Sequence, residues 1–409
     1  MDPSDWSKKA NSGITAIPGG IQAPSGGGIS AGSGVIAPPY STGSPKLDGS
    51  EGDVCVHTPK YYLSCVTSGT TTDVCMAETK INDTYKEVPA MFVDAYKGTV
   101  DKTISNVYKL VSVVNTTVNF RGGADNSTYD SYLSTDPFRT WLGKPRTGLS
   151  RATYRTYARN AGKELLSYDQ YKNIFVWPFV IEYANLYSQE AYNAKLTAEG
   201  YRQGGLGTGV ANWKSNNTTY FNDFAAYNEA GPITPCGFGN DIGNGTGIKT
   251  IVIPETVIDS SNTVPSKTFY MHRWHGFDNI YGDTYTLLDG YLYKSPNVYI
   301  ITNKANYTDN ATTAASKADR TITDCPTSGG FIKELILGEN AEILPKVVNS
   351  SGSPSQYTTD YWLSGTNESA LWVGGNVTRS WENGIFCQFS RKNTSYTTAY
   401  AAARGVQLA

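Results

Sequence analysis

The sequence is poor in charge. Only 17% of its 409 residues are Asp, Glu, Lys or Arg, and the formal net charge is −2. A protein that holds nucleic acid or an anionic membrane needs a basic surface, so we expect neither partner. No run of about 18 or more apolar residues occurs, and the N-terminus has no apolar core of a secretory signal. We therefore expect no membrane span, and a chain that is made and retained in a cytosol.

Metal-binding patterns are also scarce. The first three of the six cysteines are ten residues apart, at Cys55, Cys65 and Cys75, whereas structural zinc sites use pairs about two to four residues apart. Six cysteines permit three disulfides, but a chain of this length without a secretory signal does not need them. The sequence favours mostly free, buried thiols.

Histidines are equally few. His272 and His275 flank Trp274, and the only other histidine is His57. A metal site needs a third ligand, so hydrogen-bonded structural histidines are favoured. We expect no metal site and no cofactor.

The abundant residues are those of turns and recognition surfaces. The chain has 41 Gly and 29 Tyr against 13 Phe, and it is rich in Asn, Ser and Thr. This mixture is typical of a loop-rich fold with a Tyr-rich exposed surface.

The organisation of the chain changes near residue 50. Half of the first fifty residues are Gly, Pro or Ser. The segment therefore has too little apolar surface to offset the conformational entropy that it would lose on ordering. We interpret residues 1–50 as a flexible arm, in which Trp6 and the neighbouring lysines dock on a partner in an assembly.

Both strands and helices are predicted after the arm. Residues 55–120 have β-branched and aromatic runs between turn residues, which indicates short strands. Ser150 is a predicted N-cap for a helix over residues 151–164. The pattern over 168–189 predicts a second helix, and Pro178 should kink it or end its first part. The predicted fold class is α+β.

Three arginines, Arg151, Arg155 and Arg159, share one face of the first predicted helix. Such a row could form an anion site. Charges at this spacing more commonly indicate a helix face that is exposed to water, and we favour that interpretation.

Three segments carry a family resemblance. Residues 371–409 place variable-looking polar and aromatic residues on a frame of Gly374, Gly375, Gly384, Ile385, Phe386, Ala403 and Arg404. A second match is Glu182, Tyr183 and Ala184 in the second helix, and a third is Gly282, Asp283, Tyr285, Leu287, Asp289 and Gly290. The chain resembles the C-type-lectin-like domain of formylglycine-generating-enzyme-like proteins and of variable proteins of diversity-generating retroelements, including Bacteroidales phage virion proteins.

The resemblance implies a domain organisation. Residues 81–409 would form the C-type-lectin-like domain with a loop-rich face, residues 51–80 a small β-rich connector, and residues 1–50 a virion anchor. Trp274 and Tyr285 are expected in its core.

The resemblance also implies a binding surface at the C-terminus. The positions that vary in such relatives correspond to Thr378, Arg379, Trp381, Glu382, Gln388, Phe389, Arg391, Lys392, Tyr396, Thr398 and Tyr400. Glu382, Arg391 and Lys392 must give this segment an exposed face, whereas Trp381 and Phe389 could equally be core.

The implied function is that of a phage virion protein, assembled in the host cytoplasm, which binds a glycan or protein receptor on the host surface. It would contact other virion proteins through residues 1–50 and form a homo-oligomer. One alternative is a sulfatase-modifying-factor-like enzyme, but that chemistry uses two neighbouring cysteines and this region has only Cys387. A structural capsid decoration protein is the other alternative.

Overall fold

The computed structural model describes residues 30–31 and 46–409 with short gaps. The gaps are residues 124, 126, 136, 139, 184, 191, 193–203, 211–232, 254–255, 260–261, 265, 350–359, 366–367, 378 and 380–381. Most of the predicted N-terminal arm therefore lies outside the described residues.

β-Structure dominates the fold. Of the described residues, 37% are in strands and 14% in helices. The predicted α+β class is therefore wrong, and the chain folds mainly as β-sheet. The sequence patterns for helices were real but short, while many strands of two to eight residues are spread along the rest of the described chain.

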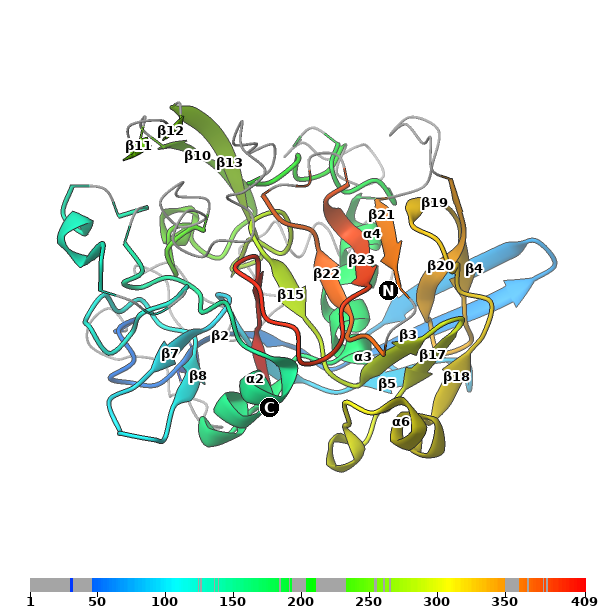
Figure 1. The fold of residues 1–409 in the computed structure, drawn as a ribbon. Helices are drawn as coiled ribbons and strands as arrows, with labels where there is room; N and C mark the ends of the chain where they lie inside the picture. Colours follow the sequence, from blue (N-terminus) through cyan, green and yellow to red (C-terminus); the bar gives the residue numbers. More distant parts are fainter. Residues whose placement is uncertain are drawn as a thin grey trace.

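The largest sheet has seven strands in the order β20-β19-β21-β23-β22-β15-β24. Its pairs are antiparallel except for the parallel pairs of β21 with β23 and of β15 with β24. Its strands are β15 (Tyr285–Leu287), β19 (Gly330–Leu337), β20 (Ile343–Asn349), β21 (Tyr361–Ser364), β22 (Trp372–Gly374), β23 (Gly384–Ser390) and β24 (Ala401–Ala402). The orange and red strands of Figure 1 show β23 inside this sheet, between β21 and β22.

A five-stranded sheet joins the two ends of the described chain, in the order β1-β2-β6-β25-β9. Its strands are β1 (Ser30–Ala31), β2 (Val54–Thr58), β6 (Met91–Asp94), β9 (Glu164–Leu165) and β25 (Gly405–Leu408). Both β2 and β25 pair with β6. Within residues 51–80, strand β2 thus shares a sheet with the last residues of the chain.

Smaller sheets complete the β-structure. They contain β3 (Tyr61–Ser68), β4 (Thr71–Ala77) and β5 (Lys86–Val88); β7 (Thr99–Asp101) and β8 (Lys109–Val111); β10 (Gly247–Ile253), β13 (Lys267–Trp274) and β14 (Phe277–Asp278); β11 (Thr256–Asp259) and β12 (Asn262–Val264); and β16 (Tyr291–Lys294), β17 (Asn297–Ile300) and β18 (Arg320–Ile322).

The helices are short. The longest described one is α2 (Arg151–Asn160), and Ser150 caps it as predicted by accepting a hydrogen bond from the Thr153 amide at 3.2 Å. The others are α3 (Tyr168–Tyr171), α4 (Trp177–Tyr183) and α6 (Ala311–Lys317), a π-helical turn at Lys172–Val176, and 3-10 turns at Asp130–Tyr132, Asn240–Ile242 and Lys304–Asn306. Among the described residues, no helix is long and apolar enough to span a membrane.

The second predicted helix is continuous but not uniform. The π-helical turn lies between α3 and α4, and Pro178 is the second residue of α4, so the helix changes its geometry before the proline rather than ending there. Tyr171, Phe175 and Phe179 are buried, as predicted.

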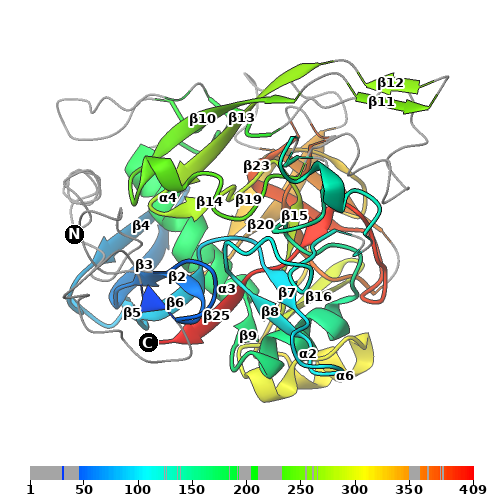
Figure 2. The ribbon, with the colours of Figure 1, turned by 90° about the vertical axis from the view of Figure 1, so that its left-hand side faces the viewer.

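This helical segment lies between two groups of strands, as Figure 2 shows for α3. The Tyr61 hydroxyl of β3 donates to the Asn173 carbonyl at 2.6 Å on one side, and the Tyr171 hydroxyl donates to the Ile385 carbonyl of β23 at 2.7 Å on the other. The principal hydrophobic core includes Trp274, while Tyr285 belongs to a second buried cluster under β22 and β23. Both aromatic residues are buried, which confirms that prediction.

The arginines of α2 are not on a solvated face. The Arg151 side chain is fully buried and donates to Asp309 at 2.6 Å, and Arg155 donates to Asp289 at 2.6 Å. Only Arg159 remains substantially exposed, beside Glu164. The arginine row connects helix α2 to distant loops instead of facing water.

Candidate functional site

The predicted binding segment divides into a buried strand and an exposed loop. Every residue of β23 is buried, including Gln388 and Phe389. Thr398, in the loop, is also buried at 6% exposure. Gln388 and Phe389 do not reach the solvent, because β23 is an inner strand of the seven-stranded sheet and both of its faces are covered. Thr378 and Trp381 lie outside the described residues.

Gln388 and Phe389 stabilise the base of the site. The Gln388 side-chain amide donates to the Ile343 carbonyl of β20 at 3.1 Å. The Phe389 ring stacks on Trp372 with ring centroids 5.0 Å apart and contacts Tyr285 at 5.3 Å. Together the three rings form an aromatic layer under the loop that follows β23.

The glycine frame has a clear physical reason. Gly374, Gly375 and Gly384 have φ values of +88°, +74° and +145°, which residues with a Cβ rarely adopt. A Cβ atom on Gly384 would overlap the Asp360 carboxylate, which accepts a hydrogen bond from the Phe386 amide at 2.7 Å. The frame therefore sets the start of β23.

The loop after β23 is held by backbone hydrogen bonds. The Gly148 amide donates to the Thr398 carbonyl at 2.9 Å, and the Arg151 amide donates to the Thr394 carbonyl at 3.2 Å. The two bonds connect the loop to the start of helix α2, so its backbone is held independently of most of its side chains.

Charged and aromatic side chains form part of the outer surface of this loop. Arg391 is exposed, and Lys392, Tyr396 and Tyr400 are partly exposed. The Tyr396 ring stacks on Trp372 at 6.0 Å, and the Lys392 ammonium lies 4.6 Å from the Tyr396 ring centroid. Tyr400 contacts Tyr285 edge-on at 6.2 Å. The aromatic layer thus orders the surface tyrosines from below.

Arg379 and Glu382 extend this surface. They form an ion pair at 2.7 Å, with 32% and 21% of their side chains exposed. Tyr361, at the start of β21, is partly exposed, and the charges of Glu382, Arg379 and Arg391 act on it. Sequence reasoning missed Tyr361 because it precedes the framed segment and pairs with it only through the sheet. We call Tyr361, Arg379, Glu382, Arg391, Lys392, Tyr396 and Tyr400 the C-terminal surface.

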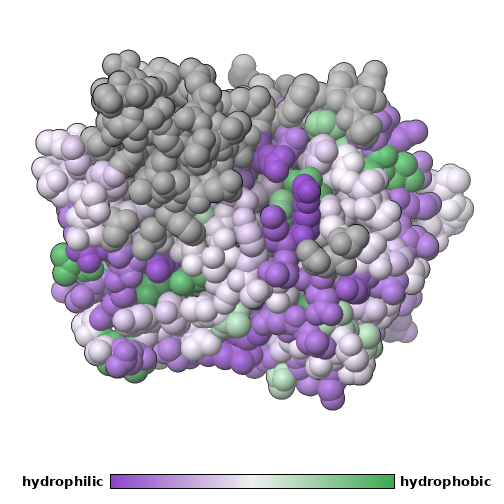
Figure 3. All heavy atoms as spheres, in the orientation of Figure 1, coloured by the Kyte–Doolittle hydropathy of each residue, from purple (hydrophilic) through white to green (hydrophobic). Residues whose placement is uncertain are grey.

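Figure 1 shows the segment after β23 in red, on the face toward the viewer, and Figure 3 shows this face by hydropathy. Hydrophilic and near-neutral residues surround small hydrophobic areas there. This composition is typical of a recognition surface rather than of an obligate hydrophobic interface.

The thiols and histidines are held inside the protein. All six cysteines are free and only Cys75 is exposed, which confirms the prediction of mostly free, buried thiols. Burial, together with the Asp360 charge, raises the pKa of the Cys387 thiol well above its ordinary value, so this group stays protonated at neutral pH.

The two neighbouring histidines make the predicted structural hydrogen bonds. The His275 Nε2 and Trp274 Nε1 atoms each lie 2.8 Å from one carboxylate oxygen of the buried Glu182. The Tyr281 amide donates to His272 Nε2 at 3.4 Å, and burial lowers the pKa of His272 to about 3. Within the described part of the chain, no group of three His, Cys, Asp or Glu residues is placed to hold a metal ion.

The chain was compared with known protein families and with curated proteins. No protein-family model matches the chain, and no curated protein matches it either.

Proposed function

We propose that this protein is a phage virion component that attaches to a receptor on the host cell surface through the C-terminal surface. The observation that carries the proposal is the stacking of Tyr396 on the buried Trp372 and Phe389 pair, with the exposed Arg391 in the same loop. Tyrosine, tryptophan and arginine supply most of the binding energy in protein interfaces.

The arrangement supports recognition because the aromatic groups are already ordered. Tyrosine adds a large contact area with only two side-chain torsions, so a ring held from below loses little entropy when it binds. Tyr396 and Tyr400 are both held in this way, by Trp372 and Tyr285. Charges of both signs next to them give the surface its specificity.

The division into buried and exposed positions also supports the proposal. The glycine turns, β23 and the carbonyl contacts of Thr394 and Thr398 set the backbone. Replacement of Arg391, Lys392 or Tyr396 would leave those contacts in place. A fixed backbone with replaceable outer side chains is what the resemblance to retroelement variable proteins implies.

Residues 1–50 complete the proposal as the virion anchor. Their Gly, Pro and Ser content supports an arm that becomes ordered on other virion proteins. A homo-oligomer would present several copies of the C-terminal surface and increase attachment through avidity. The receptor would be a glycan or a protein.

Binding of the fluorescently labelled full-length chain to a panel of Bacteroidales strains tests the proposal. We expect the wild-type chain to label some strains, and Arg391→Ala/Tyr396→Ala to lose that labelling while it keeps its melting temperature within a few degrees. Lys346→Ala/Tyr270→Ala is the matched control, since both residues are exposed and lie outside the C-terminal surface. Equal labelling by the two double variants would remove the assignment.

A further inference from the structure

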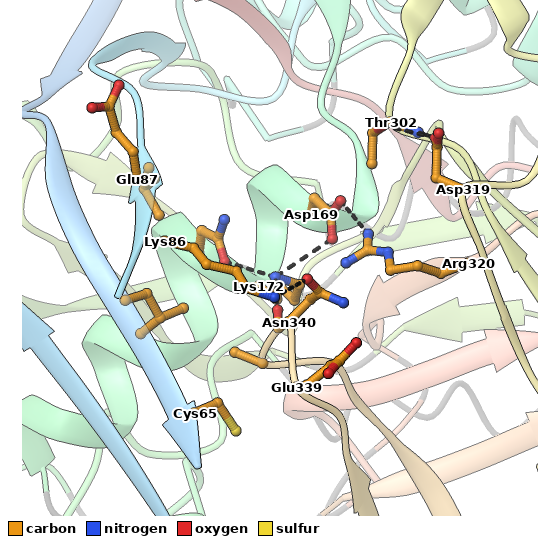
Figure 4. A pocket seen from close by; sticks show the side chains of 14 residues that line it. Cys65, Lys86, Glu87, Asp169, Lys172, Thr302, Asp319, Arg320, Glu339 and Asn340 are labelled. Atoms are coloured by element: carbon orange, nitrogen blue, oxygen red, sulfur yellow. Dashed lines mark hydrogen bonds and ion pairs between the residues drawn. The ribbon is translucent and has the colours of Figure 1, made fainter. Parts of the chain in front are cut away.

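A polar pocket of about 500 Å³ lies away from the C-terminal surface. Its walls come from β3 and β5, from the helical segment at Asp169–Asn173, from the turn at residues 339–341 and from β18. Figure 4 shows these side chains converging on one hollow. No residue between 378 and 400 lines the pocket.

Acidic residues outnumber basic ones in the lining of this pocket. Its lining has three basic residues, Lys86, Lys172 and Arg320, and four acidic ones, Glu87, Asp169, Asp319 and Glu339. Arg320 donates to both Asp169 and Glu342, and the buried Lys172 ammonium lies 3.4 Å from the Asp169 carboxylate. The excess of carboxylates disfavours an anion, and a metal ion would have to displace Arg320 from Asp169. An apolar ligand would have to dehydrate these charges.

The pocket nevertheless offers unused hydrogen-bonding groups of known orientation. Lys172 donates to the Asn173 side-chain oxygen at 2.9 Å, and Lys86 donates to the Asn340 side-chain oxygen at 2.6 Å. With each oxygen held, both amide nitrogens remain as donors, and neither has a partner in the described part of the chain. Figure 4 shows Lys172 and Asn340 at the centre of the hollow, with Glu339 on its rim.

Apolar groups complete the lining. Leu63, Val88 and Ala341 contribute a small apolar area beside the amides. A ligand that suits this lining has many groups that both donate and accept hydrogen bonds, carries no net charge and has an apolar C–H face. A sugar ring meets all three conditions.

The hollow continues beyond one sugar. Thr302 lines both this pocket and a second one of about 830 Å³, whose wall includes Gln170, Asn303 and the aromatic ring of Tyr307. Asp169 and Gln170, neighbours in α3, line one pocket each. The two pockets are therefore neighbours, with Thr302 on the wall between them.

We infer that these two pockets together form a binding groove for an uncharged oligosaccharide. The amide groups of Asn173 and Asn340 bind its hydroxyls directly. The site is independent of the C-terminal surface, so either assignment can fail without the other.

A printed array of neutral and acidic oligosaccharides, probed with the labelled full-length chain in buffer with EDTA, tests this inference. We expect neutral oligosaccharides to bind, and Asn173→Asp/Asn340→Asp to weaken that binding about tenfold or more. The substitution keeps the oxygens that accept from the lysines and replaces each amide donor by a negatively charged carboxylate oxygen, which can only accept. Glu339→Ala, at an exposed position, should weaken binding without a change in melting temperature.

Matched controls separate the possible outcomes. Asn106→Asp, at an exposed position outside the groove, and Arg391→Ala/Tyr396→Ala should both bind the array like the wild-type chain. The inference would be overturned if no neutral oligosaccharide on the array bound the chain, or if the groove variants bound as tightly as the wild-type chain. Loss of binding in the presence of inorganic phosphate or EDTA would also overturn it.

Discussion

Phe389 is the residue on which the base of the C-terminal surface depends most. Its ring is 4% exposed and lies against Trp372 and Tyr285 at centroid distances of 5.0 and 5.3 Å. Truncation of a buried phenylalanine to alanine costs about 3 to 5 kcal/mol, through lost burial and the cavity that remains. Because two aromatic neighbours lose a packing partner, we expect the loss of stability in Phe389→Ala to lie at the upper end of that range.

The comparison with Arg391→Ala makes this prediction specific. Arg391, two residues further along the chain, is exposed, and such substitutions usually shift stability by less than about 0.5 kcal/mol. Urea unfolding followed by tryptophan fluorescence should show a large fall in the midpoint for Phe389→Ala and almost none for Arg391→Ala. Equal midpoints would show that Phe389 is not part of the core and would refute the division into buried strand and exposed loop.

Three further predictions concern the interior. Trp274→Ala should cost about 3 to 5 kcal/mol and lower the melting temperature, since Trp274 is 2% exposed; an unchanged melting curve would contradict its place in the core. The pKa of His272 is lowered to about 3 by burial, so its contribution to stability is complete above about pH 6.5 and is lost as the pH falls toward 3. The urea midpoint of His272→Gln should therefore depend less on pH across this range than that of the wild-type chain, and parallel profiles would refute this. A native thiol titration should detect Cys75 alone, and rapid reaction of further thiols would contradict the burial of the other five.

Local sequence signals predicted local structure well. The Ser150 cap and the aromatic stripe of Tyr171, Phe175 and Phe179 depend on neighbouring residues, and the structure confirms both. The fold class was wrong because two helical patterns were easy to recognise, whereas short strands with irregular alternation were not.

The partners of polar residues could not be predicted from local patterns. Arg155 pairs with Asp289, which is 134 positions away, and Gln388 with Ile343, which is 45 positions away. In an inner strand with both faces covered, polar and apolar residues do not alternate. Without that alternation, the sequence of β23 is similar to that of an exposed variable segment. Only the sheet order distinguishes Gln388 from Arg391.

The most direct test of receptor binding is the adsorption rate of phage particles that carry Arg391→Ala/Tyr396→Ala in this chain. The account predicts particles that assemble normally, with a chain that melts within a few degrees of the wild type. These particles should adsorb to host cells much more slowly than particles with the Lys346→Ala/Tyr270→Ala control. Adsorption at the wild-type rate by intact particles would contradict the assignment of receptor binding to the C-terminal surface.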